Sequence, residues 1–153
     1  MNSDSLVFSP AWQLREWIGS RQLSPVELMN QYLQRIDAIN PKLNAFLTIN
    51  AESALLEARM AEEAVFAKEV LGPLHGIPVP IKDLTKTAGI RTTLGSLLYR
   101  DNFPTYDEPV VERIRSAGGI IVGKTNTPEF GHRGTTENLL GGPCRNPWNT
   151  TLT

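Results

Sequence analysis

A lysine at the end of an apolar segment that contains two prolines has the clearest chemical potential in this sequence. Lys82 follows the run Gly76-Ile77-Pro78-Val79-Pro80-Ile81 and precedes Asp83. Because adjacent residues of a strand point to opposite faces, Asp83 is not expected to pair with Lys82. A lysine in an apolar, poorly solvated place loses its proton more easily and can act as a general base near neutral pH. On residue type alone, a lysine whose stem lies along the surface is the commoner explanation.

The stretch Gly118–Thr125 fits the phosphate-loop pattern G-x-x-x-x-G-K-[ST], but its surroundings argue against nucleotide binding. Such a loop follows a strand and opens a helix, whereas here a helix is expected before it and Pro128 lies soon after it. The middle positions, Ile120-Ile121-Val122, favour a buried strand. We therefore predict that a strand leaves the core at Gly123 and that Lys124 lies at the rim.

Other reactive side chains give weaker signals. His75 is expected in a turn or at a rim, and His132 shows only a Glu-x-x-His spacing, which is a weak indication of a metal site. Cys144 lies in a turn with no evident base beside it, and one cysteine excludes an internal disulfide. Asp83 and Asp101 are expected to be turn or cap residues.

The overall composition is that of a globular protein and excludes several classes of function. The chain has 153 residues, of which 41% are apolar and 20% charged, and its net charge is −1. A near-neutral balance predicts no binding to nucleic acid or to an anionic membrane. The sequence contains no run of about 18 apolar residues, which is the length needed to span a membrane. The single cysteine fits a reducing compartment, so we expect a cytoplasmic protein.

Glycine and proline are concentrated in the second half, where residues 71–153 hold nineteen of the 23. We therefore predict a helical leader over residues 1–70 and part of an α/β core over residues 71–153. The leader should contain a helix opened by Ser9-Pro10, a helix that begins at Ser24-Pro25 and stops at Asn40-Pro41, and a third over about 51–68.

The second half alternates between short strands and a helix. Residues 77–81 are expected to be extended, 110–117 helical and 120–122 a buried strand, and 45–49 is also β-leaning. Pro78 and Pro80 remove N–H donors from one side of their strand, which should therefore be an edge or face irregular chain. The interleaving of strands and helices indicates an α/β or mixed class.

An ordered set of motifs along most of the chain resembles the amidase signature family. The motifs are Gly76–Asp83, Gly89–Ser96, Asp107–Ile114, Ala117–Phe130, Thr136–Asn138 and Gly142–Trp148. The leader from Ser24 through Phe46 is also similar to the usual start of the family. Each motif alone is weak, but their order is highly specific.

This resemblance implies the N-terminal part of the amidase-signature fold, a mixed β-sheet flanked by helices. Family members are serine hydrolases that cleave a carboxamide to an acid plus ammonia or amine, through an acyl-serine and with a Ser, cis-Ser and Lys triad. The resemblance implies that Lys82 is the base that deprotonates the bridging serine. It also places Thr127 and Phe130 in the vicinity of the substrate site, and it implies a small-molecule amide substrate and no metal or organic cofactor.

The catalytic serines of the family lie in a Gly-Gly-Ser-Ser-Gly-Gly-Ser type segment that these 153 residues do not contain. We therefore expect an N-terminal portion, truncated before the serine loop and inactive alone. One alternative is a non-catalytic remnant or assembly module whose helices pair into a homo-oligomer. Another is a fragment of an amidotransferase subunit, although the turn Pro128-Glu129-Phe130 looks more like a free-standing amidase. Open sheet edges also predict self-association of the isolated chain.

Overall fold

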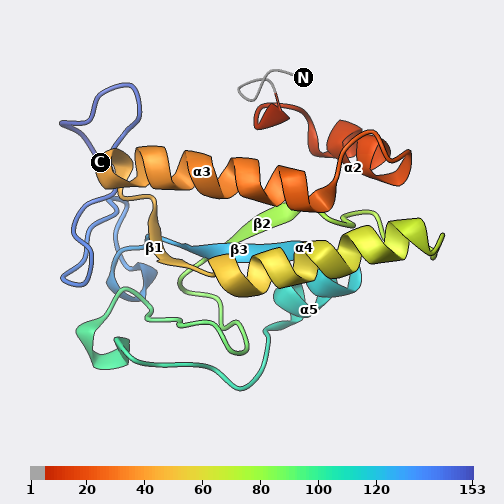
Figure 1. Ribbon diagram of the computed structural model, residues 1–153. Helices are drawn as coiled ribbons and strands as arrows, with labels where there is room; N and C mark the ends of the chain where they lie inside the picture. Colours follow the sequence, from red (N-terminus) through yellow and green to blue (C-terminus); the bar gives the residue numbers. More distant parts are fainter. Residues whose placement is uncertain (1–5) are drawn as a thin grey trace. The chain divides into compact units, whose positions relative to one another are not determined.

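The computed structural model describes residues 6–153, in which helices and strands alternate along the chain (Figure 1). The helices are α2 (Ala11–Gly19), α3 (Pro25–Leu43), α4 (Ala51–Phe66) and α5 (Pro109–Ser116), and the strands are β1 (Phe46–Ile49), β2 (Pro78–Lys82) and β3 (Ile120–Thr125). Two short 3-10 helices are η1 (Leu97–Tyr99) and η2 (Glu129–Gly131). These elements confirm the predicted α/β class. Within the described range, none of the helices has the length and apolar character needed to cross a membrane.

The three strands form one mixed sheet in the order β1-β3-β2. β1 runs antiparallel to β3. β2 runs parallel to β3, because the Ile120 N–H donates to the Ile77 carbonyl and, further along both strands, the Asp83 N–H donates to the Thr125 carbonyl. β2 lies at an end of this order, which confirms the edge position predicted from its two prolines.

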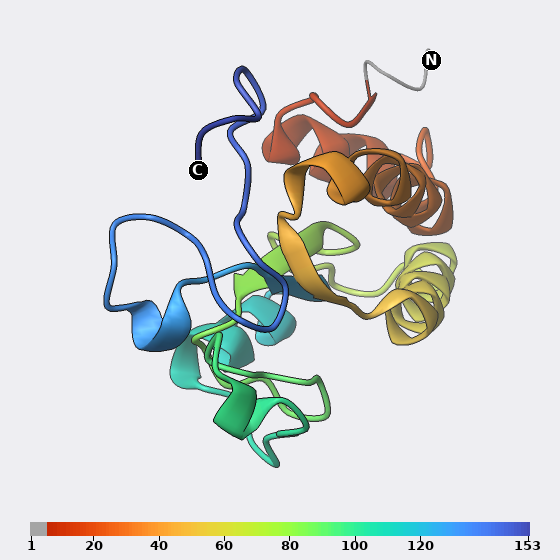
Figure 2. The same cartoon turned by 90° about the vertical axis from the view of Figure 1, so that its left-hand side faces the viewer.

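The chain divides into two compact units that interleave along the sequence. The first comprises the chain up to Arg35, Asn50–Val79 and Glu112–Val122, and the second comprises Ile36–Ile49, Pro80–Val111 and Gly123–Thr153. The second unit contains the long segments 84–108 and 126–153, whose only helices are the 3-10 turns η1 and η2 (Figure 2, green to teal and blue). The predicted division into a helical leader over residues 1–70 and a core over residues 71–153 stays a prediction.

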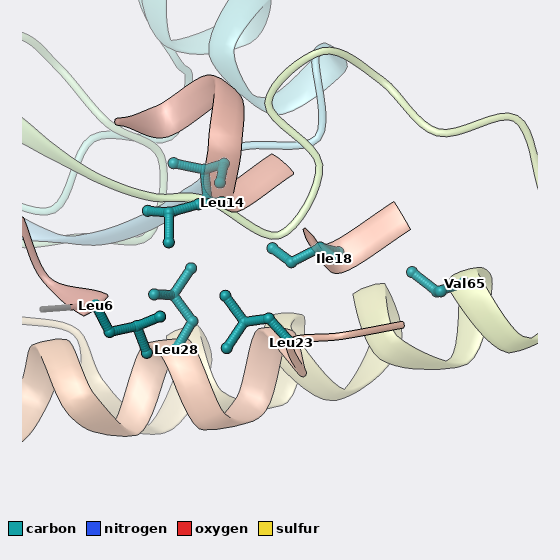
Figure 3. Packing of buried hydrophobic residues seen from close by; sticks show 7 residues of the cluster. Leu6, Leu14, Ile18, Leu23, Leu28 and Val65 are labelled. Atoms are coloured by element: carbon teal, nitrogen blue, oxygen red, sulfur yellow. The ribbon is translucent and has the colours of Figure 1, made fainter. Parts of the chain in front are cut away.

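Aliphatic packing stabilises the first unit (Figure 3). Leu14 and Ile18 of α2, Leu28 of α3 and Val65 of α4 belong to one buried cluster. Helical spacing places the apolar residues of each helix on one face, so that these faces can meet. The face of α4 that packs inward is formed largely by small side chains, since its alanines at positions 54, 58 and 61 are buried.

The start of α3 is confirmed as a capped helix end. The hydroxyl oxygen of Ser24 accepts hydrogen bonds from the N–H groups of Val26 at 3.0 Å and Glu27 at 3.2 Å. These bonds satisfy two of the N–H groups that have no partner inside a helix.

The end of α3 differs from the prediction, because the helix continues through Pro41 to Leu43. Pro41 lacks only the N–H that would bond to the Asp37 carbonyl, and it lies in the last turn, where few helical bonds remain to be lost. Asn44 then ends the helix in a left-handed conformation (φ 52°), and its N–H donates to the Asn40 carbonyl at 2.7 Å.

Replacing Leu28 by alanine is expected to lower the free energy of unfolding by about 2–5 kcal/mol, because the change leaves a cavity in the cluster. Leu28 is fully buried, whereas Leu98 is 86% exposed and provides the matched control. Leu98→Ala should change the unfolding free energy by less than about 0.5 kcal/mol. Urea denaturation followed by circular dichroism measures both, and equal losses in the two variants would contradict the assignment of this core.

Candidate functional site

Lys82 is the last residue of β2, and its side chain is exposed while those of Ile81 and Asp83 are buried. This alternation confirms that Lys82 and Asp83 point to opposite faces. The Lys82 carbonyl accepts a hydrogen bond from the Thr85 N–H at 3.0 Å, so the chain turns directly after the strand. Within residues 6–153, the side chain of Lys82 is therefore open to solvent.

Asp83 lies in this turn, as predicted, but its side chain is fully buried and clamps the backbone. Its N–H donates to the Thr125 carbonyl at 3.1 Å, and its carbonyl accepts from the Leu94 N–H at 3.0 Å. Its carboxylate Oδ2 accepts from the N–H of Thr93 at 3.0 Å and from the Thr93 hydroxyl. Four hydrogen bonds therefore fix the residue that follows Lys82. The second carboxylate oxygen, Oδ1, is buried and accepts no hydrogen bond from the described residues.

Lys124 is fully buried in the second unit, so the prediction that it lies at the rim is wrong. Its Nζ donates to the Thr85 carbonyl, to the hydroxyl of Thr87 at 3.0 Å and to the hydroxyl of Thr92 at 2.9 Å. Three acceptors match the three N–H donors of a lysine ammonium. β3 does not end at Gly123 but continues to Thr125, and Lys124 therefore stays in the strand and in the interior.

The two threonine hydroxyls are oriented to receive the ammonium. The hydroxyl of Thr87 donates to the Thr85 carbonyl at 3.2 Å, and that of Thr92 donates to the Ile90 carbonyl at 3.0 Å. Each hydroxyl proton is thus used on the backbone, which leaves oxygen lone pairs free to accept from Lys124.

Burial and nearby charge act in opposite directions on this lysine. Burial lowers the pKa of Lys124 from 10.5 to about 8, and the negative charges of Asp83, Glu108 and Asp107 oppose that fall. For its part, burial raises the pKa of Asp83, while the hydrogen bonds from Thr93 and the positive charge of Lys124 oppose the rise. Because its pKa lies above 7, Lys124 is mainly charged at neutral pH and helps to balance the buried carboxylate.

The sequence contains a signal for the buried Lys124 that the rim prediction did not use. Ile120, Val122 and Lys124 fall on the same face of one strand by period-two alternation, and the first two are apolar. All three are buried. A lysine in register with two core residues is a candidate for an internal ammonium.

A turn at Leu94 links the residue after Lys82 to the segment of Phe130. The Leu94 N–H donates to the Asp83 carbonyl at 3.0 Å, and the Leu94 carbonyl accepts from the Phe130 N–H at 2.8 Å. Leu94 and Phe130 both have positive φ, 55° and 49°, a costly conformation that persists only where the surroundings hold it. A Cβ on Gly95 (φ 67°) would lie 2.9 Å from the Thr127 carbonyl oxygen, so glycine permits this close approach.

The two residues predicted near the substrate site have different surroundings. Phe130 is 52% exposed, and its ring meets that of Tyr99 edge-on with centroids 6.1 Å apart. Thr127 is fully buried, and its hydroxyl donates to the Pro128 carbonyl at 3.1 Å. An open cavity of about 450 Å³ adjoins this segment and has Glu129 among its lining residues. The Phe130 ring is therefore accessible from solvent, whereas the Thr127 side chain is not.

Three asparagines hold the loop around Thr127, and none of them was among the residues predicted to matter at the site. The amide nitrogen of Asn126 donates to the Asn44 carbonyl at 2.9 Å. The amide nitrogen of Asn138 donates to the side-chain oxygen of Asn126 at 2.7 Å and to the Thr127 carbonyl at 2.8 Å. Their available signal was position, since Asn126 and Asn138 both lie inside the motifs that carry the family resemblance.

The remaining candidates form no second site. His75 is half-buried, with its Nε2 2.9 Å from the Ala61 carbonyl oxygen, and Cys144 is half-buried with a free thiol. His132 is exposed, and no group of three or more His, Cys, Asp or Glu side chains in residues 6–153 could hold a metal ion. The phosphate-loop pattern begins at Gly118, in the turn that follows α5, and includes the whole of β3, which confirms that it is not a loop between a strand and a helix.

The sheet, its helices and the segments that carry Lys82 and Phe130 match part of the α/β fold of solved amidase signature structures. A bacterial aryl acylamidase of the amidase signature family matches with a TM-score of 0.88 at 30% identity, over 94% of this chain and 30% of that one. The peptide amidase of Stenotrophomonas maltophilia matches with a TM-score of 0.87 at 32% identity, over 94% and 31%.

The chain belongs to the amidase family, whose model, described as Amidase, matches residues 27–153. An acylamidase of Rhodococcus erythropolis is 43% identical over 148 residues, which are 97% of this chain and 31% of the relative. The A-type subunit of a glutamyl-tRNA(Gln) amidotransferase from Synechococcus sp. is 44% identical over 140 residues, which are 92% and 28%. The resemblance seen in the motifs is thus confirmed, and the chain spans about a third of the length of these relatives.

The free energy of unfolding is expected to rise as the pH is raised from about 8 to about 9.5. Because the folded-state pKa of Lys124 is about 8 and its ordinary value is 10.5, the unfolded chain binds more protons in this window, and removing protons favours folding. Lys124→Met should flatten the rise, whereas Lys42→Met, at an exposed lysine, should keep it. Urea titrations across this window measure the slopes. A wild-type slope no steeper than that of Lys124→Met would refute the lowered pKa of Lys124 in the folded chain.

Proposed function

We propose that this chain carries the catalytic lysine of an amide hydrolase, and that Lys82 is the general base of a Ser, cis-Ser and Lys triad. The Lys82 amine takes the proton of a bridging serine, which in turn takes the proton of the nucleophilic serine. That serine attacks the carboxamide carbon and expels ammonia or an amine, and water then releases the carboxylic acid. The observation that carries this proposal is the family match over residues 27–153, in which Lys82 stands at the exposed end of β2.

The geometry around Lys82 supports a substrate site on the same side of the second unit as Phe130. Hydrogen bonds at Leu94 tie the residue after Lys82 to Phe130, whose ring is exposed. We assign the segment Thr127–Phe130 to the wall of this site, with the Phe130 ring against a small-molecule amide and Thr127 fixing the backbone. The mechanism uses no metal or organic cofactor, and we keep a cytoplasmic location as a prediction.

Taken alone, the 153 residues are proposed to be inactive. Ser96 is the one serine of the second unit, and it is buried with its hydroxyl oxygen accepting from the Leu98 N–H at 3.4 Å, as a cap of η1. Because Ser96 is buried and the Lys82 side chain is exposed, Ser96 is not proposed as the bridging serine. The lysine would then require the serines that the family places elsewhere.

A second candidate function is that of an amidotransferase component, since the A-type subunit of a glutamyl-tRNA(Gln) amidotransferase is 44% identical over 140 residues. Such a protein should hydrolyse the side-chain amide of glutamine in preference to an aryl amide. A third candidate is a non-catalytic remnant or assembly module. Reading the gene beyond the codon for Thr153 distinguishes these: a stop codon supports the remnant, and a frame that continues into a Gly-Gly-Ser-Ser segment supports either enzyme.

Lys82→Ala is expected to reduce amide hydrolysis by the complete gene product by at least about a thousandfold, because loss of one triad member removes most of the activation. Lys86→Ala is the matched control, since Lys86 lies in the same loop and donates to the Tyr106 hydroxyl at 2.7 Å. The assay follows release of an arylamine from an aryl amide. Turnover by the purified 153-residue chain that is lost in Lys82→Ala would refute the proposed inactivity of the chain alone.

The isolated chain is also proposed to self-associate, through exposed apolar side chains such as Trp12 (69% exposed), Leu98 (86%) and Trp148 (92%). Exposed apolar surface and open strand edges favour association because it removes both from water. Light scattering at increasing concentration should show oligomers or aggregates. A monodisperse monomer at every concentration would contradict this.

A further inference from the structure

We propose that Asp83 and Lys124 are positioning residues for Lys82, a role that rests on the catalytic function proposed above for Lys82. Their side chains are fully buried, whereas that of Lys82 is exposed. Asp83 and Lys124 therefore act through the backbone and do not touch the reacting atoms.

The first step of the argument is the covalent neighbourhood of Lys82 and Asp83. Lys82 and Asp83 share a peptide bond, and their side chains point in opposite directions at the strand end. A rotation of the backbone at Asp83 therefore moves the Lys82 amine as well. The backbone of Asp83 is held on both sides of its Cα, since its N–H donates to the Thr125 carbonyl at 3.1 Å and its carbonyl accepts from the Leu94 N–H at 3.0 Å. The carboxylate of Asp83 adds a third attachment, at Thr93. The direction in which Lys82 projects is therefore set by its neighbour.

The second step is the loop that begins at Asp83 and returns to it at Leu94. Lys124 lies inside this loop and donates to three of its residues, Thr85, Thr87 and Thr92. These three acceptors satisfy all three N–H donors of the Lys124 ammonium, and a displaced loop would leave a buried charge without partners. Lys124 thus holds in place the turn that Asp83 needs.

Thr93 connects the Asp83 carboxylate to the turn at Leu94 through hydrogen bonds. Its hydroxyl donates to Asp83 Oδ2 and accepts from the Gly95 N–H at 3.1 Å, while its own N–H also donates to Oδ2. Thr93→Val keeps the shape of the side chain and removes the hydroxyl, whereas Thr93→Ser restores it. This pair of variants separates the hydrogen bond from the packing.

The experiment measures kinetics and amide hydrogen exchange in the complete gene product, with the folded fraction of each variant checked by circular dichroism. Thr93→Val is expected to lower kcat by about 10- to 100-fold, because small displacements of a reacting group cost that much, and to change KM little. The amide protons of Asp83 and Leu94 should exchange faster in the same variant. Thr93→Ser should recover most of both losses. Thr105→Val, at an exposed threonine of the same unit, is the control and should match the wild type.

Asp83→Asn and Lys124→Met provide independent tests, since each removes one of the two buried charges. Both should lower kcat more than they raise KM, at temperatures where circular dichroism shows a folded protein. A folded Thr93→Val that exchanges faster at Asp83 and Leu94 but keeps wild-type kcat would overturn the positioning role. Unchanged exchange at these two amides would overturn the proposal that the Thr93 hydroxyl holds the backbone of Asp83 and Leu94 in place.

Lys82→Ala in the same assay separates this proposal from the one on which it rests. If Lys82→Ala keeps full activity, the catalytic role of Lys82 fails, and the positioning role fails with it. If Lys82→Ala is inactive and Thr93→Val has wild-type kinetics, only the positioning role fails. Loss of activity in both, with rescue by Thr93→Ser, supports both.

Discussion

A buried ammonium group is the interaction on which the interior of the second unit depends. Lys124 leaves water completely, which is costly for a charge unless hydrogen bonds and an opposite charge replace its hydration. A backbone carbonyl and two threonine hydroxyls use all of its donors, and the carboxylate of Asp83 supplies negative charge. Because these acceptors belong to one loop, satisfying the charge also determines the path of that loop.

The interiors of the two units are therefore stabilised by different means. The first relies on a cluster of aliphatic side chains from helices, where burial is favourable in many similar arrangements. The second contains eight buried polar side chains, and its segments 84–108 and 126–153 have little regular structure. Backbone groups in such segments need partners that helices and strands do not provide, and here Thr, Asn and Asp side chains provide them. Directional hydrogen bonds give these loops a defined shape, which binding and catalysis on loops require.

The polar interior of the second unit lies next to the two residues, Lys82 and Phe130, that the family resemblance assigns to the site. The loop around Lys124 begins directly after Lys82, and the turn at Leu94 that closes it also meets the segment of Phe130. The described residues thus determine where the lysine and the aromatic ring lie. The same residues leave the side chain of Lys82 exposed.

Much of the fold could be predicted from local patterns in the sequence. Helical spacing and a capping serine predict the start of α3, the continuous apolar run Ile120-Ile121-Val122 predicts the buried β3 strand, and two prolines predict the edge position of β2. The ordered motifs were sufficient to predict the family. These features depend on residues close together in the chain, and a sequence displays such relations directly.

Tertiary structure alone decided how the polar residues around the candidate site are used. Alternation places Lys124 on the face of Ile120 and Val122, but it does not tell what covers that face. The threonine hydroxyls that receive its ammonium lie 32 and 37 residues away along the chain. The buried carboxylate of Asp83 likewise depends on Thr93, ten residues away. Whether a charged side chain is buried depends on such distant partners, because only they can replace the water that it loses.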